Sequence, residues 1–402
     1  MSLTDFKPQF DNAYQEIFQK VLVAKKIMNT RFEATLKYGE SVERVAYDIS
    51  NVRVRTVVRG SASTIDTITD SSELLEINLE KEAVFHISDG EVKQAGPLNP
   101  GEVIGGQVGR KVAIDLDARC FAEVLNASYD FDTGDLTTLS SNATPITLSS
   151  TTVPQLVSRA PAKLRRANNQ EVMVNMAMVV DSYAASDIAQ YLLGKNIDLA
   201  GAVFKNGYTD VVSNAEMYVT ENLTGEAVLG LATTPTDGDT VTIGGVVFTF
   251  RTTLGSTAGA VLISGSADAA RANLTALINT PGTTDTYGVA LSAADQLVIT
   301  DTLKLVATNN NTTNKMTIVG TGSGRLILAE TFTDATDAWD KNFIHAYFGK
   351  KGAIDLVVQD MKEVDMRETA DRRGTNVFSS YLAGVKTFAD GAKKFLDVHI
   401  AA

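Results

Sequence analysis

Residues 75–87 read Leu-Glu-Ile-Asn-Leu-Glu-Lys-Glu-Ala-Val-Phe-His-Ile, with apolar side chains at alternate positions and one break at Lys81. A period of two is the pattern of a strand that is buried on one face only. Val52 and Val54 begin a similar alternation upstream. We therefore expect residues 49–93 to form a long two-stranded β-ribbon, with the polar segment 61–72 at its tip or base.

A long helix is predicted directly after this ribbon. Asn99 is a suitable N-cap, Pro100 suits the first helical position, and Glu102 completes the spacing of a capping box. The helix should end near Asn126. It contains three glycines, each costing ~1 kcal/mol relative to alanine, so we expect close packing against another backbone as compensation: Gly105, Gly106 and Gly109.

Further elements on both sides give a mixture of helices and strands. An apolar stripe predicts an N-terminal amphipathic helix over 9–29. Helices are also expected at 153–168, 181–193 and 197–204, and strands at 171–180, 215–220, 343–348, 353–359, 378–387 and 395–400. The fold class is therefore α+β.

Residues 232–336 differ in composition from the remainder of the chain. They hold 13 of the 84 charged residues and 24 threonines, so we expect an inserted, mainly β domain. Gly244-Gly245 predicts a hairpin turn, and Ser266 is the N-cap of a helix that continues to about residue 279. Short strands are expected at 297–300, 304–307 and 315–319.

Composition excludes several classes of function. The net charge of −12 argues against a general nucleic-acid-binding surface. A single cysteine, Cys120, rules out an intrachain disulfide and is expected in the core, and three histidines are too few for a usual His/Cys metal cage. No apolar run is long enough to cross a membrane.

Sequences that mimic catalytic or ligand sites are better explained as turns. Gly320–Gly324 is glycine-rich but lacks the lysine of a phosphate-binding loop. Asp237 and Asp239 flank a turn glycine, which favours a turn over a cation site. We therefore assign no catalytic, cofactor-binding or metal-binding residue, and we expect a protein that is not an enzyme.

Four segments resemble the major capsid proteins of tailed bacteriophages, with the fold named after the Hong Kong 97 phage: 75–95, 172–193, 206–223 and 367–400. The order of these segments carries the resemblance more than any one of them. It implies a Hong Kong 97-like α+β fold with an N-terminal arm, an extended loop, a spine helix, and peripheral and axial domains. The implied boundaries are an arm at 1–48, an extended loop at 49–98, a peripheral domain with the spine helix at 99–154, axial parts at 155–231 and 337–364, the insertion at 232–336, and peripheral closing strands at 365–402.

The resemblance also implies a function and partners. The chain would assemble with itself into hexamers and pentamers of an icosahedral shell around double-stranded DNA, bound without sequence specificity. A portal and a separate scaffolding protein are implied partners, with a decoration protein as a further candidate, and the virion, assembled in the bacterial cytoplasm, as the location. Candidate contacts between subunits are Glu76, Glu80, Lys81, Glu82, Lys93, Asp365, Arg367, Glu368, Asp371, Arg372 and Arg373.

Three alternatives remain at this point. The β-rich insertion also suits a tail-tube or decoration protein of a virion. An encapsulin-like compartment shell would share the fold but enclose enzymes. An enzyme is the third alternative, disfavoured by the scarcity of histidine and of catalytic motifs.

Overall fold

The computed structural model describes residues 3–33, 41–48, 52–56, 59–60, 65–88, 100–168, 174–193, 211–212, 215–361, 365–368 and 374–402. Two compact units make up the chain. Unit 1 comprises Met1–Lys20, Lys25–Val112 and Gly352–Lys393, and unit 2 comprises Val21–Ala24, Ala113–Lys351 and Lys394–Ala402. No helix among the described residues is both long enough and apolar enough to span a membrane.

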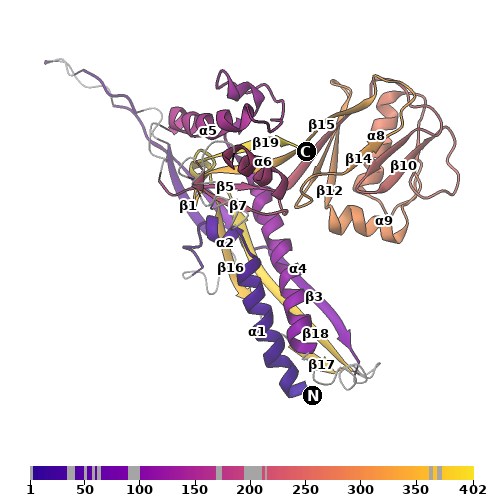
Figure 1. Ribbon diagram of the computed structural model, residues 1–402, viewed down its shortest axis with the longest axis horizontal. Coiled ribbons are helices and arrows are strands. Elements are labelled where there is room, and N and C mark those ends of the chain that lie inside the picture. The colour runs from indigo at the N-terminus through magenta and orange to yellow at the C-terminus, as the bar shows by residue number, and fades with distance from the viewer. Residues whose placement is uncertain are drawn as a thin grey trace. The chain divides into compact units, whose positions relative to one another are not determined.

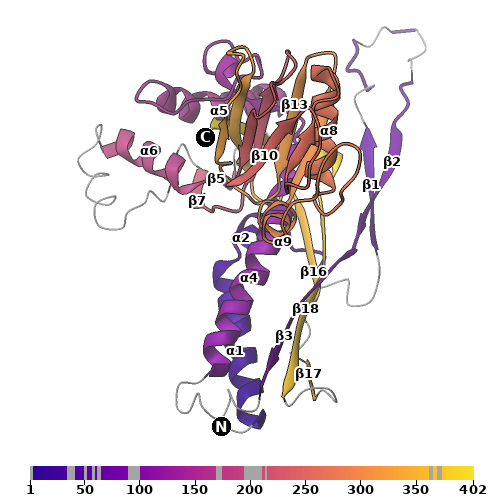
Figure 2. The same cartoon turned by 90° about the vertical axis from the view of Figure 1, so that its right-hand side faces the viewer.

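Two helices in unit 1 pack closely. Helix α1 (Leu3–Val21) lies alongside the first half of α4 (Pro100–Ala122), as both views show (Figures 1 and 2). A Cβ atom at Gly105 would lie 2.6 Å from the Phe10 carbonyl oxygen, and one at Gly109 would lie 2.6 Å from that of Tyr14. The predicted close backbone approach is therefore confirmed at Gly105 and Gly109, whereas a Cβ atom at Gly106 would meet only the Ile17 side chain, at 3.6 Å.

The predicted N-terminal helix begins earlier and ends earlier than expected. After α1, the short helix α2 (Ala24–Ile27) starts anew. Both carboxylate oxygens of Asp117 accept hydrogen bonds there, from the backbone N–H of Val23 at 3.0 Å and of Ala24 at 2.9 Å. This buried carboxylate satisfies the N–H groups that a new helix start leaves open, so the chain breaks where the apolar stripe alone predicts continuity.

The predicted ribbon over 49–93 is wrong in its pairing. Strand β2 (Thr69–Glu76) pairs along its whole length with β1 (Ser41–Asp48), which lies outside the predicted range (Figure 2). Strand β3 (Leu79–Ile87) follows β2 after two residues but pairs with β18 (Thr375–Lys386). Leu75 and Ile77 are buried against Val357 and Phe388, so burial holds this junction extended instead of letting it turn back.

A four-stranded sheet completes unit 1. Its long strand β18 pairs with β3 on one side, and with β16 (Asp355–Met361) and β17 (Asp365–Glu368) on the other. On β18, Val377, Ser379, Tyr381 and Ala383 are buried at alternate positions. One face of the sheet is thus packed in the interior, and the other carries the more exposed side chains.

Unit 2 is built on a nine-stranded sheet with the order β12-β13-β8-β15-β5-β7-β6, to which β19 adds by pairing with β15, and β4 by pairing with β19. The strands outside the insertion are β4 (Asp130–Phe131), β5 (Met176–Val180), β6 (Val211–Val212), β7 (Ala215–Val219), β8 (Thr224–Gly230), β15 (Ala338–Lys350) and β19 (Phe395–Ala401). The helices are the second half of α4, α5 (Thr152–Asn168) and α6 (Ser182–Leu193), with 3-10 turns η1 (Glu123–Asn126) and η2 (Thr133–Leu136). The predicted helix at 197–204 lies outside the described residues.

The last strand corrects the predicted grouping of 365–402. Strands β17 and β18 belong to the four-stranded sheet, but β19 belongs to the nine-stranded sheet, after the short helix α10 (Ala389–Ala392). Residues 395–398 of β19 are all buried, as expected for a strand covered on both faces. The choice of partner depends on this burial and on register, which the local sequence pattern does not specify.

The insertion connects two neighbouring strands. Gly230 at the end of β8 pairs with Ala338 at the start of β15, and Asp337 accepts a hydrogen bond from Ala232 N–H at 2.7 Å. Residues 232–336 therefore form a long connection between two adjacent antiparallel strands, β8 and β15. They form a second sheet of β9 (Thr240–Ile243), β10 (Val246–Arg251), β11 (Ala260–Leu262) and β14 (Leu328–Glu330), with helices α8 (Ala267–Asn279), α9 (Ala293–Leu297) and η3 (Val298–Thr302).

Most predicted elements of the insertion are confirmed. The hairpin turns at Gly244-Gly245, and the Ser266 side chain caps α8. The expected strand at 297–300 is wrong, because α9 and η3 occupy these residues. Strands β12 (Leu305–Asn310) and β13 (Lys315–Gly320) continue the main sheet through β8, so the insertion shares a sheet and a hydrophobic core with its host. Its boundaries as a separate domain stay a prediction.

Candidate assembly surfaces

The base of the β1–β2 ribbon is fixed by charged side chains. Arg44 of β1 stands opposite Glu73 of β2 in the strand register. The Arg44 guanidinium pairs with Asp390 at 2.6 Å and with the buried Asp355 at 3.4 Å, while its planar group lies over the Phe388 ring. Glu73 accepts a hydrogen bond from the backbone N–H of residue 389, at the start of α10. These contacts hold one end of the ribbon.

The other end of the ribbon exposes apolar side chains. Val54 is fully exposed and Ile65 is 89% exposed. Val52 and Ile68 are exposed as well. The backbone N–H of Arg53 donates to Asp66 at 2.9 Å, so the two segments remain adjacent beyond the paired strands. A two-stranded ribbon is marginally stable by itself in water, and exposed apolar side chains add to that cost.

The structure brings the two predicted clusters of contact residues to one sheet. Glu80, Lys81 and Glu82 are exposed on β3, and Asp365 and Arg367 are exposed on β17. These two strands flank β18 on opposite sides. Sequence reasoning placed the clusters nearly 300 residues apart without linking them, because the link is a strand register that only the folded chain defines.

The predicted ion pairs of the β17 cluster form partly within one strand. The Arg367 guanidinium bonds to Asp365 at 2.8 Å and lies over the Phe378 ring at 5.3 Å. Both side chains are more than half exposed, so this pair adds little stability and can exchange partners. Glu368 ends β17 and Glu76 ends β2. The remaining predicted residues, Lys93, Asp371, Arg372 and Arg373, lie outside the described residues.

Residues that could be mistaken for reactive or ligand-binding groups in the sequence have structural roles. Cys120 is buried, as predicted, and burial raises the pKa of its thiol well above the usual value. Asp237 accepts hydrogen bonds from the backbone and hydroxyl of Thr252, and Asp239 accepts from the backbone N–H of Thr236. These bonds hold the turn that the Asp-Gly-Asp sequence predicts.

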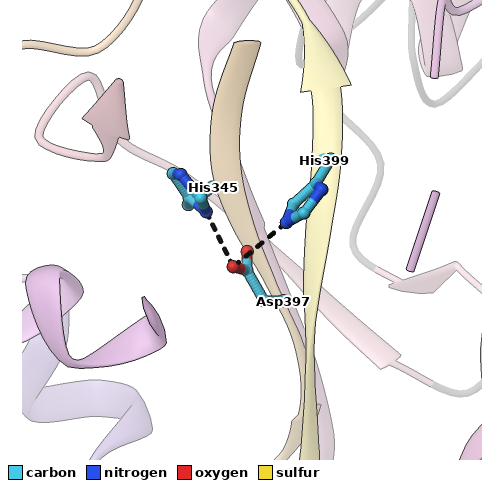
Figure 3. Close-up of side chains that lie close together, drawn as sticks. All are labelled: His345, Asp397 and His399. Carbon is cyan, nitrogen blue, oxygen red and sulfur yellow. Dashed lines mark hydrogen bonds and ion pairs between the residues drawn. The ribbon is translucent and has the colours of Figure 1, made fainter. Parts of the chain in front are cut away.

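Sequence reasoning missed one polar cluster in unit 2. His345 on β15 and Asp397 and His399 on β19 lie together, as Figure 3 shows. Burial alone lowers the pKa of His345, but the charge of Asp397 and hydrogen bonds to Asp397 and Glu226 outweigh it and raise the pKa to about 9. The Asp-x-His spacing at 397–399 places both side chains on one face of a strand, and this is the signal that could have been found. His345 lies 52 residues before Asp397, and only the pairing of β15 with β19 places it beside them.

Comparisons with known proteins give structural likeness without sequence likeness. No family model matches the sequence, and no curated protein matches it. A solved structure described as Mycobacterium phage Che8 has a TM-score of 0.48 and 13% identity, covering 93% of this chain and 90% of the other. The capsid structure of cyanophage P-SCSP1u has a TM-score of 0.46 and 11% identity, covering 90% and 84%. A virus-like particle from Pyrococcus furiosus has a TM-score of 0.40 and 10% identity, covering 97% and 98%. Bacteriophage capsids are thus among the structures to which this chain is similar.

Proposed function

We propose that this chain is the major capsid protein of a tailed bacteriophage, which assembles with copies of itself into the icosahedral shell around double-stranded DNA. The observation that carries the proposal is the β1–β2 ribbon, which is held at its base and exposes Val54 and Ile65 beyond its paired strands. A segment of this kind gains stability when another subunit covers it.

Charge favours a second copy of the chain as the cover. Residues 49–68, between β1 and β2 in the sequence, carry three arginines and one aspartate, whereas the whole chain has a net charge of −12. Glu80 and Glu82 are exposed on β3 and offer acidic partners. A basic segment at the end of the ribbon on an otherwise acidic subunit is self-complementary between copies, so assembly should weaken as salt concentration rises.

The remaining partners follow from this role. A portal, a separate scaffolding protein and a decoration protein are proposed partners, and the packaged DNA would be held without sequence specificity. An acidic shell repels the DNA phosphates overall, so it does not hold the enclosed genome tightly when the genome must leave again. The proposed location is the virion, after assembly in the bacterial cytoplasm.

The test uses the full chain with a matched pair of variants. Val54→Glu combined with Ile65→Glu should leave the circular dichroism spectrum unchanged but abolish shell formation, measured by sedimentation velocity and electron microscopy. Ile327→Glu is the control, because Ile327 is 77% exposed on the insertion and outside the ribbon. The control should assemble. Shells formed equally well by the ribbon variant would overturn the proposed role of the ribbon, and tubes formed by the unaltered chain would favour a tail-tube protein.

A further inference from the structure

The polar cluster of unit 2 consists of two imidazoles and one carboxylate at short range. His345 Nδ1 lies 2.7 Å from Asp397 Oδ2, and His399 Nε2 lies 3.3 Å from the same oxygen (Figure 3). One ligand atom from each of the three residues falls within 4.8 Å of the others. The His345 and Asp397 side chains are 3% and 4% exposed, and the His399 side chain is 12% exposed.

The backbone fixes these positions. Strands β15 and β19 are antiparallel, and His345 stands directly opposite His399 in their register. Asp397 precedes His399 by two residues and therefore points to the same face of the sheet. Three donor groups on paired strands of a central sheet cannot separate without breaking the ladder, so the site is already organised in the folded chain.

A neighbouring carboxylate orients the more buried histidine. His345 Nε2 lies 3.3 Å from Glu226 Oε2, on β8. With the proton of this imidazole on Nε2, the Nδ1 lone pair faces Asp397 and can bind an ion. A histidine that binds a metal ion through one nitrogen usually donates its other N–H to a carboxylate in this way.

The cluster also holds polar atoms whose hydrogen-bonding capacity is unused. The second carboxylate oxygen of Asp397, Oδ1, is buried and has no hydrogen-bond partner among the described residues. The same holds for the Thr224 hydroxyl, and Thr224 stands opposite His345 in the β15–β8 register. Buried polar atoms without partners are costly, and an ion or its bound water would satisfy them.

We propose that His345, Asp397 and His399 form a binding site for a divalent transition-metal ion of the zinc class. Two imidazole nitrogens and one carboxylate oxygen are ligands that zinc accepts, whereas magnesium and calcium prefer oxygen alone. Ligands about 2.0–2.2 Å from a tetrahedral zinc ion lie roughly 3–4 Å from one another, which the cluster reaches with small side-chain movements. A water molecule would take the fourth position.

Binding is balanced by the release of a proton. The ion displaces the proton that His345 and Asp397 share, and the proton leaves to solvent, so no oxidant or reductant is required. Asp130 pairs with Asp397 in the parallel β4–β19 register and adds a further negative charge near the site. The bound ion would join β19, the last strand of the chain, to β15 by coordination as well as by backbone hydrogen bonds.

The test uses the full chain after treatment with a chelator, and Co²⁺ and Zn²⁺ as probes. Titration with Co²⁺ should give visible absorption bands of a site with nitrogen ligands, saturating at one ion per chain, and excess Zn²⁺ should remove them. Zn²⁺ should also raise the unfolding temperature, while Mg²⁺ at the same concentration should not. The absence of saturable Co²⁺ bands from the folded chain would overturn the proposal.

The histidines of the chain provide a matched pair of variants. His399→Gln removes one ligand at the more exposed position, and should weaken Co²⁺ affinity at least tenfold with an unchanged circular dichroism spectrum. His86→Gln is the control, because His86 lies on β3 and hydrogen-bonds to Asn376, in unit 1. Equal Co²⁺ affinity in the two variants would overturn the assignment of His399. These measurements concern binding by the chain itself, so they do not depend on whether it forms a shell.

Discussion

The close packing of α1 on α4 gives the sharpest test of the fold. Gly109→Ala would place a Cβ atom 2.6 Å from the Tyr14 carbonyl oxygen and 3.1 Å from its Cα. Ordinary contacts between such atoms are about 3.5 Å or longer, and the obstruction is backbone, which cannot rotate away. Helix α1 must therefore move back by roughly 1 Å, and the ring contacts of its Phe10, Tyr14 and Phe18 side chains move with it.

Gly106→Ala is the matched control on the same helix. Its Cβ atom would lie 3.6 Å from Ile17 Cγ1, which is an ordinary contact. Both substitutions gain the same helix propensity, about 1 kcal/mol. Overpacking costs typically 1–3 kcal/mol, and only Gly109→Ala incurs it. The difference between the two variants thus isolates the close approach, and Gly109→Ala should be less stable than Gly106→Ala by about 1–3 kcal/mol.

The measurement is urea unfolding of the purified chain, followed by far-ultraviolet circular dichroism. Hydrogen exchange of the α1 amides should accelerate in Gly109→Ala and remain unchanged in Gly106→Ala, because only the former displaces the helix. Equal stabilisation by both substitutions would refute the reasoning, since it would mean that α1 does not rest on the glycine face of α4.

Three further outcomes are expected. Arg44→Met keeps an unbranched apolar side chain but removes the ion pairs and the guanidinium contact with the Phe388 ring at the ribbon base, costing about 1 kcal/mol. Trypsin should then cut within residues 49–68 faster, and an unchanged rate would count against this role of Arg44. Asp132→Asn weakens an acceptor of three backbone N–H groups and one hydroxyl, costing about 1.5–3 kcal/mol. Burial raises the pKa of Asp132, but these bonds have the larger effect and lower it below the unfolded value of 3.8. The ionised side chain therefore stabilises the fold above pH 3.8, and this stabilisation is lost as pH falls through the lower folded pKa. The variant should lack this pH-dependent part of acid unfolding, and identical acid-unfolding curves for the two proteins would contradict the assignment. Replacing residues 232–336 by Asn-Gly removes β12 and β13 from the main sheet and exposes part of the core they share with β8, but β8 and β15 still pair. The host should therefore fold with a lower midpoint of urea unfolding than the full chain, and an unfolded product by circular dichroism would contradict the predicted insertion.

Local patterns predicted most elements but few of their partners. The cap at Ser266, the hairpin at Gly244-Gly245 and the compensation at Gly105 follow from chemistry within a few residues or from one helix meeting another backbone. The pairing of β2 with β1, and of β19 with β15, depends on register between distant strands and on burial of Leu75. An alternating pattern indicates a half-buried strand but does not name its neighbour.

The candidate surfaces show the same division. Charged residues on β3 and β17 could be selected from the sequence, because runs of charge on strands are visible there. That both strands flank β18 could not be predicted. The cluster of His345, Asp397 and His399 was missed for a related reason. The number of histidines in a sequence does not show that two of them stand opposite each other on paired strands.

Because the β1–β2 ribbon is held near its base, a small rotation there displaces its far end by a larger distance. Strand β1 has eight residues, so its paired length is about 26 Å at ~3.3 Å per residue. Arg44 lies four residues before the far end of β1 at Asp48, so a rotation of about 10° at Arg44 would displace that end by roughly 2 Å. Buried Leu75 fixes the base, whereas the contacts of Arg44 and Glu73 beyond it are ion pairs and one hydrogen bond to α10, which yield more readily than packed apolar side chains. Small adjustments near α10 are therefore magnified along the ribbon, and in the proposed shell one sequence could reach neighbours set at different angles while its own core stays unchanged.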